Sequence, residues 1–133
     1  MVLHIKITGI LLIALAFIHL IFPRYFKWKT AFKEVSLINR EVMYVHTFFI
    51  ALMVLLMGIL CVAANSDLVH TKLGSQINLG LGIFWFMRLG VQFFVYSSQH
   101  WKGKLFETVV HVVLTALWIY FSTVFLYTYW IYP

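Results

Sequence analysis

Charge is scarce in this chain, and acidic residues are the scarcest. Asp and Glu together number 4 of the 133 residues, and all charged residues make up 11% of the sequence. Soluble domains carry about 25% charged residues, so the composition excludes an ordinary soluble protein. Hydrophobic residues account for 63% of the chain, and the mean hydropathy is +0.94. The composition therefore predicts an integral membrane protein.

Cysteine and the common catalytic motifs are nearly absent as well. The single Cys61 excludes an internal disulfide and a multi-cysteine metal site. The sequence holds no HExxH, no Gly-rich phosphate loop and no paired-carboxylate motif. This argues against metalloprotease, nucleotide-binding and carboxylate di-iron chemistry. No low-complexity tract interrupts the chain, so we expect one domain over residues 1–133.

Long apolar runs, by contrast, occupy most of the sequence. Four of them are long enough to cross roughly 30 Å of hydrocarbon as helices. They cover about residues 5–22, 42–64, 77–96 and 108–130. These runs predict an all-α membrane protein, a four-transmembrane-helix bundle with up-down topology. Ser36 is expected to cap a helix that runs from Leu37 into the second span.

Basic residues gather in two of the predicted loops. The first and third loops contain Arg24, Lys27, Lys29, Lys33, Arg40, Lys102 and Lys104. Because Lys and Arg mark cytoplasmic loops, we expect a multi-pass protein of the bacterial inner membrane with both termini on the non-cytoplasmic side. Aromatic residues at that boundary, including Trp28, Tyr44, Tyr96 and Trp101, are typical of interfacial belts.

The net charge of +6 accompanies this topology. It indicates attraction to the anionic head groups of membrane lipids, and we do not interpret it as nucleic-acid binding. A homo-oligomer and a larger membrane complex are both compatible with such a small apolar chain. The redox partner and the substrate are not specified by the sequence.

Two short segments resemble one another and suggest an internal repeat. WKTAFKE at residues 28–34 is similar to WKGKLFE at residues 101–107, and each follows one span and precedes another. Alignment of their tryptophans sets His19 opposite Gln92. With an eight-residue deletion it also sets His46 opposite His111. Two parallel helical-hairpin repeats would explain this, and chance similarity between two interfacial boundaries is the alternative.

Each predicted span also carries a polar residue toward the same end of the bundle. These residues are His19, His46, Gln92 and His111. Helical spacing places Trp85, Arg88 and Gln92 on one face of the third span, and His111, Thr115, Trp118 and Ser122 on one face of the fourth. We expect both faces to point inward. Ionisable residues inside a membrane are functional by default, although a histidine there also serves as a simple interhelical hydrogen-bonding group.

Three classes of function are compatible with this polar layer. The first is a b-type haem protein in electron transfer, with His46 and His111 as axial ligands and His19 and Gln92 as supporting or alternative ligands. Arg88 would then need an acceptor such as a cofactor carboxylate or a quinone oxygen. The second is a copper or other transition-metal transport or handling protein, in which Met53, Met57 and Cys61 continue a metal path from the histidines. The third is a structural or regulatory membrane subunit without a cofactor.

Parts of the sequence resemble known proteins. FPRYFKWK, LINREVMYVHTFFIALMVLLMG and WKGKLFETVVH are similar to uncharacterised small four-span membrane proteins of the Bacteroidota over most of the chain. That resemblance implies the four-span fold and no activity. Pro-Arg-x-Phe after the first span also occurs in the four-helix bacterial protoporphyrinogen oxidases, which are haem proteins. The histidine and lysine arrangement of that family is not reproduced here, so no residue roles are transferred.

Overall fold

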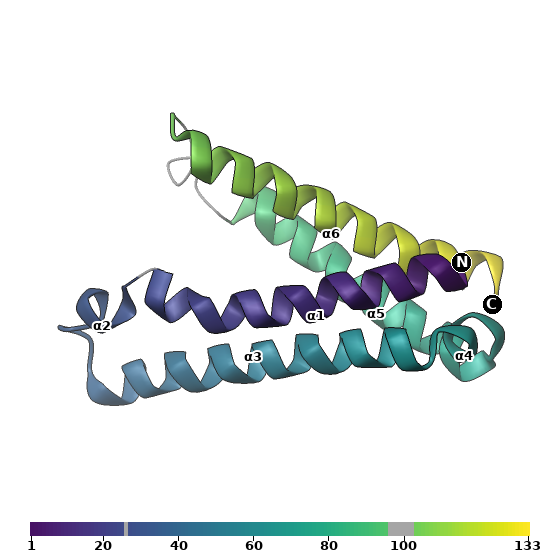
Figure 1. Cartoon of the computed structure of the whole chain (residues 1–133), viewed down its shortest axis with the longest axis horizontal. Helices are drawn as coiled ribbons and strands as arrows, with labels where there is room; N and C mark the ends of the chain where they lie inside the picture. Colours follow the sequence, from purple (N-terminus) through teal and green to yellow (C-terminus); the bar gives the residue numbers. More distant parts are fainter. Residues whose placement is uncertain (26, 96–102) are drawn as a thin grey trace. The chain divides into compact units, whose positions relative to one another are not determined.

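The computed structural model describes residues 1–25, 27–95 and 103–133, and the regular elements within them are helices (Figure 1). These are α1 (Val2–Tyr25), α2 (Trp28–Ala31), α3 (Leu37–Ala63), α4 (Asn65–His70), α5 (Lys72–Phe94) and α6 (Leu105–Ile131). In the described part of the chain, α1, α3, α5 and α6 are long and apolar enough to cross a membrane. The predictions of an all-α fold with four spans and of a multi-pass membrane protein are therefore confirmed.

The helices extend beyond the apolar runs that predicted them. α3 begins at Leu37, as predicted, and its first turn and the polar residues Asn39, Arg40 and Glu41 precede the apolar run that starts near residue 42. Ser36 does precede this helix, as predicted, but its side chain makes no capping hydrogen bond. The predicted boundary residues Tyr96, Trp101 and Lys102 lie outside the described residues.

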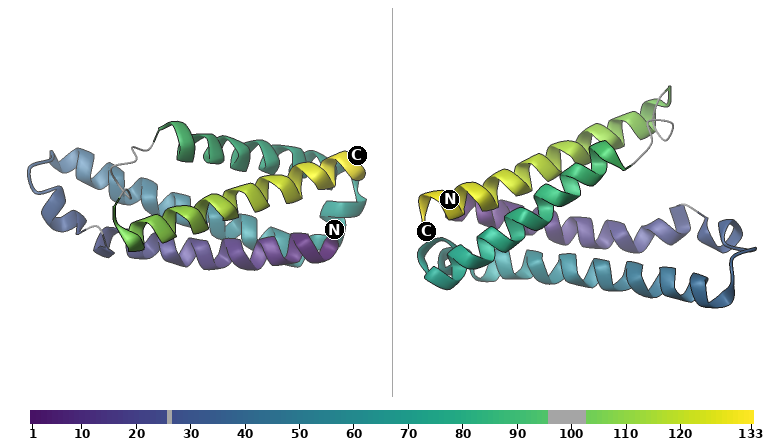
Figure 2. Two further views of the ribbon diagram at one scale, coloured as in Figure 1. Left: turned by 90° about the horizontal axis from the view of Figure 1, so that it is seen from above. Right: turned by 180° about the vertical axis from the view of Figure 1, so that it is seen from behind.

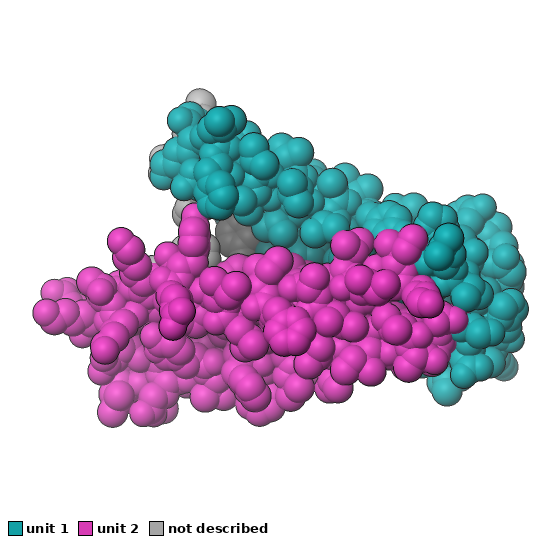
Figure 3. All heavy atoms as spheres, in the orientation of Figure 1, with its two compact units in different colours: residues 1–5, 66–133 teal, residues 6–65 magenta. Residues whose placement is uncertain are grey.

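The described chain divides into two compact units, coloured separately in Figure 3. Unit 2 comprises residues 6–65 and contains most of α1 together with α2 and α3. Its two long helices approach closely at a pair of glycines. A Cβ atom added to Gly58 would lie 2.8 Å from the carbonyl oxygen of Gly9, and one added to Gly9 would lie 2.8 Å from the Cβ of Cys61. Near-contact of the two backbones therefore holds this hairpin together.

Unit 1 comprises residues 1–5 and 66–133. In it α5 and α6 lie side by side as a second hairpin (Figure 2). Bulky side chains lie between these helices. Trp85 of α5 stacks on Trp118 of α6, and the ring centres of Phe121 and Trp85 are 5.2 Å apart. The short α4 is tied to α5 because Nδ2 of Asn78 donates a hydrogen bond to the carbonyl oxygen of Leu68 at 2.7 Å.

Candidate functional site

A chain of polar side chains connects α5 to α6 inside unit 1. Nη1 of Arg88 donates to Oε1 of Gln92 at 3.5 Å, and Nε2 of Gln92 donates to Nδ1 of His111 at 2.8 Å. Arg88 and Gln92 meet because residues four apart share one face of a helix. Gln92 is 4% exposed, while Arg88 and His111 are half-buried. Three of the predicted site residues are thus brought together, and we call them the Arg88–Gln92–His111 chain.

The orientation of the Gln92 amide assigns a tautomer to the imidazole. A side-chain amide nitrogen only donates, so Nδ1 of His111 must accept with its lone pair. The neutral ring then carries its hydrogen on Nε2, and this second nitrogen is a donor. Ligation of a metal by Nε2 would require the opposite arrangement, in which Nδ1 donates to the amide oxygen of Gln92.

Two stacked tryptophans lie beside the Arg88–Gln92–His111 chain. The rings of Trp85 and Trp118 are 5.1 Å apart with 13° between their planes, and the guanidinium carbon of Arg88 lies 5.0 Å from the centre of the Trp118 ring. A cation over an indole face is attracted by the ring quadrupole, and this attraction grows when water is excluded. The stack therefore offers Arg88 a favourable position inside an apolar segment.

The indole nitrogens of this stack lack hydrogen-bond partners among the described atoms. Nε1 of Trp85 and Nε1 of Trp118 are both buried, and the two side chains are 2% and 3% exposed. A buried N–H without an acceptor costs about 1–3 kcal/mol. The sequence placed both tryptophans on inward faces, but nothing in it indicated that their N–H groups would lack acceptors.

The other two predicted histidines belong to unit 2 and have different surroundings. Nδ1 of His19 donates to the carbonyl oxygen of Leu15 at 2.9 Å, within its own helix, and the ring packs against Phe22 at 4.8 Å. His46 is exposed on α3, and among the described residues it has no hydrogen-bond partner. One nitrogen of His19 is thus occupied locally, whereas the imidazole of His46 is available to a ligand.

The residues of the predicted copper path differ in burial along α3. Cys61 is fully buried and packs against Gly9, whereas Met53 is 53% exposed and Met57 is half-buried. Within the described ranges, no three side chains from His, Cys, Asp and Glu are grouped so that they could hold a metal ion.

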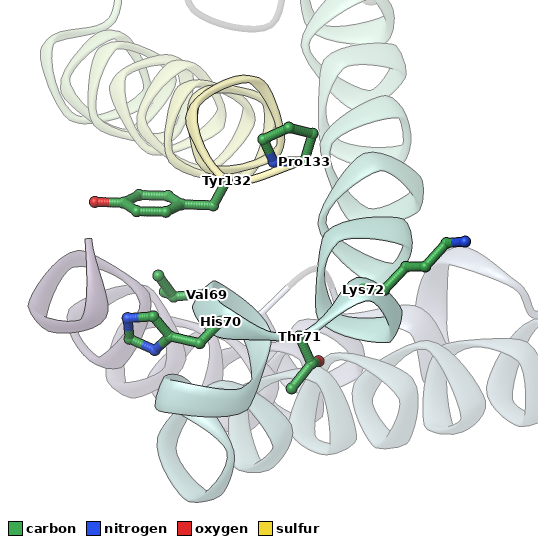
Figure 4. Close-up of a pocket in the computed structure, with 6 residues that line it drawn as sticks. All are labelled: Val69, His70, Thr71, Lys72, Tyr132 and Pro133. Carbon is green, nitrogen blue, oxygen red and sulfur yellow. The ribbon is translucent and has the colours of Figure 1, made fainter.

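A pocket of about 250 Å³ lies elsewhere in unit 1 (Figure 4). Its lining consists of Val69, His70, Thr71, Lys72, Tyr132 and Pro133. Nδ1 of His70 donates to the carbonyl oxygen of Ser66, and the Thr71 hydroxyl donates to that of Asp67 and accepts from the amide of Gly74. These bonds tie the Thr71 hydroxyl and one ring nitrogen of His70 to the ends of α4 and α5.

Comparisons of the chain with protein-family models, with curated proteins and with solved structures found no match. The function must therefore be inferred from the Arg88–Gln92–His111 chain and the residues beside it.

Proposed function

We propose that this multi-pass membrane protein binds b-type haem through His111 and His46 and transfers electrons in the bacterial inner membrane, with its basic loops toward the cytoplasm. The observation that carries the proposal is the fixed position of His111 within a membrane-length helix. Its ring is held through Nδ1 by a buried glutamine at 2.8 Å. Imidazole ligands of metals are commonly oriented by a hydrogen bond at the nitrogen that does not bind the metal, and in a ligand that nitrogen donates, so the contact to Gln92 would have to reverse its direction.

The position of His46 along α3 supports the same proposal. It lies about 14 Å from the start of its helix, and His111 lies about 9 Å from the start of α6, at 1.5 Å per residue. Both helices follow a loop that is rich in basic residues, so the two imidazoles are expected at similar depth in the membrane. Histidines from two different helices of a bundle are a common way to hold haem.

Haem binding places one requirement on the Arg88–Gln92–His111 chain. The amide of Gln92 must rotate so that its oxygen accepts from Nδ1 of His111, leaving Nε2 free of hydrogen for the iron. This rotation gives up the contact from Arg88, which at 3.5 Å is already long for a hydrogen bond. The positive charge of Arg88 suits a negatively charged propionate of the haem.

The test is the visible spectrum of the protein purified from cells supplied with haem. We expect the intense, reduction-sharpened absorption of bis-histidine haem, and we expect His111→Ala and His46→Ala each to abolish it. His70→Ala is the matched control, because His70 lies at the opposite end of the spans and should leave the spectrum unchanged. A colourless protein would contradict the proposal. Stoichiometric copper in that protein would favour metal handling, and no metal would favour a structural subunit.

The direction of the hydrogen bonds favours a second candidate, the binding of a quinone. Trp85 and Trp118 present buried N–H groups without described acceptors, beside a His111 ring whose hydrogen is on Nε2 in the described orientation of Gln92. A quinone offers carbonyl oxygens that accept such hydrogen bonds and an apolar ring that suits a membrane site. In this candidate function the protein is a quinone-binding subunit without a metal.

Gln92→Glu separates the two candidates. A carboxylate at this position accepts from Nδ1, which makes the imidazole a stronger metal ligand, so haem should be retained with a lower midpoint potential. The same change converts Nε2 into an acceptor, so quinone binding should weaken about tenfold, the equivalent of one hydrogen bond. The two readouts are the redox titration of bound haem and the binding of menadione to detergent-solubilised protein.

A further inference from the structure

The connection between α1 and α3 in unit 2 carries an excess of positive charge. Arg24, Lys27, Lys29, Lys33 and Arg40 are opposed only by Glu34 and Glu41, which leaves a net charge of +3 over residues 24–41. Arg24 and the three lysines are exposed. At the other end of the spans, the segment from the end of α3 to the start of α5 carries Asp67 and Lys72, whose charges cancel.

Aromatic side chains place this connection at the edge of the hydrocarbon. Trp28 of α2 meets Tyr44 of α3 edge to face at 5.5 Å and packs on Phe32 at 5.1 Å. Tryptophan and tyrosine prefer the boundary between lipid tails and head groups, where an apolar ring and a polar tip are both accommodated. The neighbouring basic residues are therefore expected at the level of the lipid phosphates.

Arg40 differs from the other basic residues of the connection. It is half-buried, and its Nε atom is buried without a hydrogen-bond partner. No ion pair or hydrogen bond joins its guanidinium to another of the described residues. A charge that served only to set topology would be hydrated, whereas a buried guanidinium nitrogen requires an acceptor. Arg40 also lies one turn before Tyr44, on the same face of α3 as the aromatic pair.

We propose that this segment binds an anionic phospholipid. The phosphate accepts hydrogen bonds from the guanidinium of Arg40, while Lys27, Lys29 and Lys33 attract its negative charge. The glycerol and the first carbons of the acyl chains lie against Trp28 and Tyr44. The aromatic pair favours a lipid over a free phosphate ion, because only the lipid supplies an apolar part. This proposal is independent of haem and quinone binding.

The experiment compares phosphatidylglycerol with phosphatidylcholine of the same acyl chains, added to protein in a neutral detergent. Binding is read by native mass spectrometry and by the shift in thermal unfolding. We expect phosphatidylglycerol to bind the protein and raise its unfolding temperature, and phosphatidylcholine to do neither. Loss of one basic residue should weaken binding roughly fivefold. Arg40→Gln should weaken binding more than fivefold. Arg40→Lys should have an affinity between those of Arg40→Gln and the native protein, because lysine keeps the positive charge but lacks the planar guanidinium.

Two further variants keep the test decisive. Lys29→Gln alters an exposed residue, so the fivefold loss is expected even if the half-buried Arg40 proves necessary for folding. Lys72→Gln, at the neutral end of the spans, is the matched control and should bind as the native protein does. Equal binding of the two lipids, or equal affinities of the Lys29, Arg40 and Lys72 variants, would overturn the proposal. Stabilisation by inorganic phosphate alone would overturn the assignment to a lipid.

Discussion

The two hairpins of this protein differ in what lies between their helices. In unit 2 the helices α1 and α3 approach until Gly58 has no room for a side chain beside the carbonyl of Gly9. In unit 1 the Trp85–Trp118 stack lies between α5 and α6, and Gly82 gives a second close contact, against the side chain of Leu126. The buried polar side chains follow the same division: unit 2 contributes Thr8, and unit 1 contributes Ser75, Asn78, Gln92, Ser122 and Thr128.

This difference indicates which hairpin is built mainly for packing. In a membrane, helices associate through close van der Waals contact, and small residues make that contact possible. Buried polar groups are costly there unless they are paired, and both units hold some without partners in the described part of the chain: the indole N–H groups of Trp85 and Trp118 in unit 1, and Oγ1 of Thr8 and Nε of Arg40 in unit 2. What distinguishes unit 1 is its larger set of buried polar side chains, which packing alone does not require and which suits a hairpin that holds a functional site.

The largest effect is expected from removal of the stack in unit 1. Trp118→Ala should lower the free energy of unfolding by roughly 3–5 kcal/mol, because it leaves a cavity against Trp85 and removes the ring beneath Arg88. The matched control is Trp130→Ala in the same helix, since that side chain is 79% exposed. Unfolding is followed by denaturing-detergent titration. Equal losses for the two variants would show that the stack does not hold the hairpin.

A smaller effect is expected from crowding of the glycine contact in unit 2. Gly58→Ala places a Cβ 2.8 Å from the oxygen of Gly9 and 2.9 Å from the amide nitrogen of Ile13, so the backbones must separate. We expect a loss of roughly 1–3 kcal/mol. Gly80→Ala is the control, because its Cβ would have no neighbour within 4 Å. Alanine favours helix over glycine by about 1 kcal/mol, so this control should be neutral or stabilising.

Much of this comparison follows from the sequence. Hydropathy identifies the four spans directly, because a helix must be apolar over about 20 residues to cross the hydrocarbon core of a membrane. Helical spacing also placed Arg88, Gln92 and His111 on inward faces, and the structure brings them together. Spacing predicted these faces because residues three and four apart lie on the same face of a helix, and this does not depend on which helix packs against them.

Other features could not be predicted from one sequence. The neutral Gln92 accepts a hydrogen bond from Arg88, although Glu41 and Glu107 are the acidic residues nearest the predicted spans. Periodicity gives the face of a residue but not the rotamer that brings its atoms to a partner. The glycine contact between Gly9 and Gly58 depends on the crossing point of two helices, which the spacing within each helix does not encode.

The smallest effect concerns the starts of the helices, where the two units differ again. The hydroxyl of Thr71 accepts a hydrogen bond from the amide of Gly74 at 2.9 Å and so caps α5, whereas Ser36 precedes α3 without such a bond. Thr71→Ala should therefore cost about 1 kcal/mol. Ser36→Ala should cost close to nothing, because no hydrogen bond is lost. Both variants are measured in the same detergent titration, and equal losses would mean that residue type alone, rather than the observed capping bond, determines the stability of these helix starts.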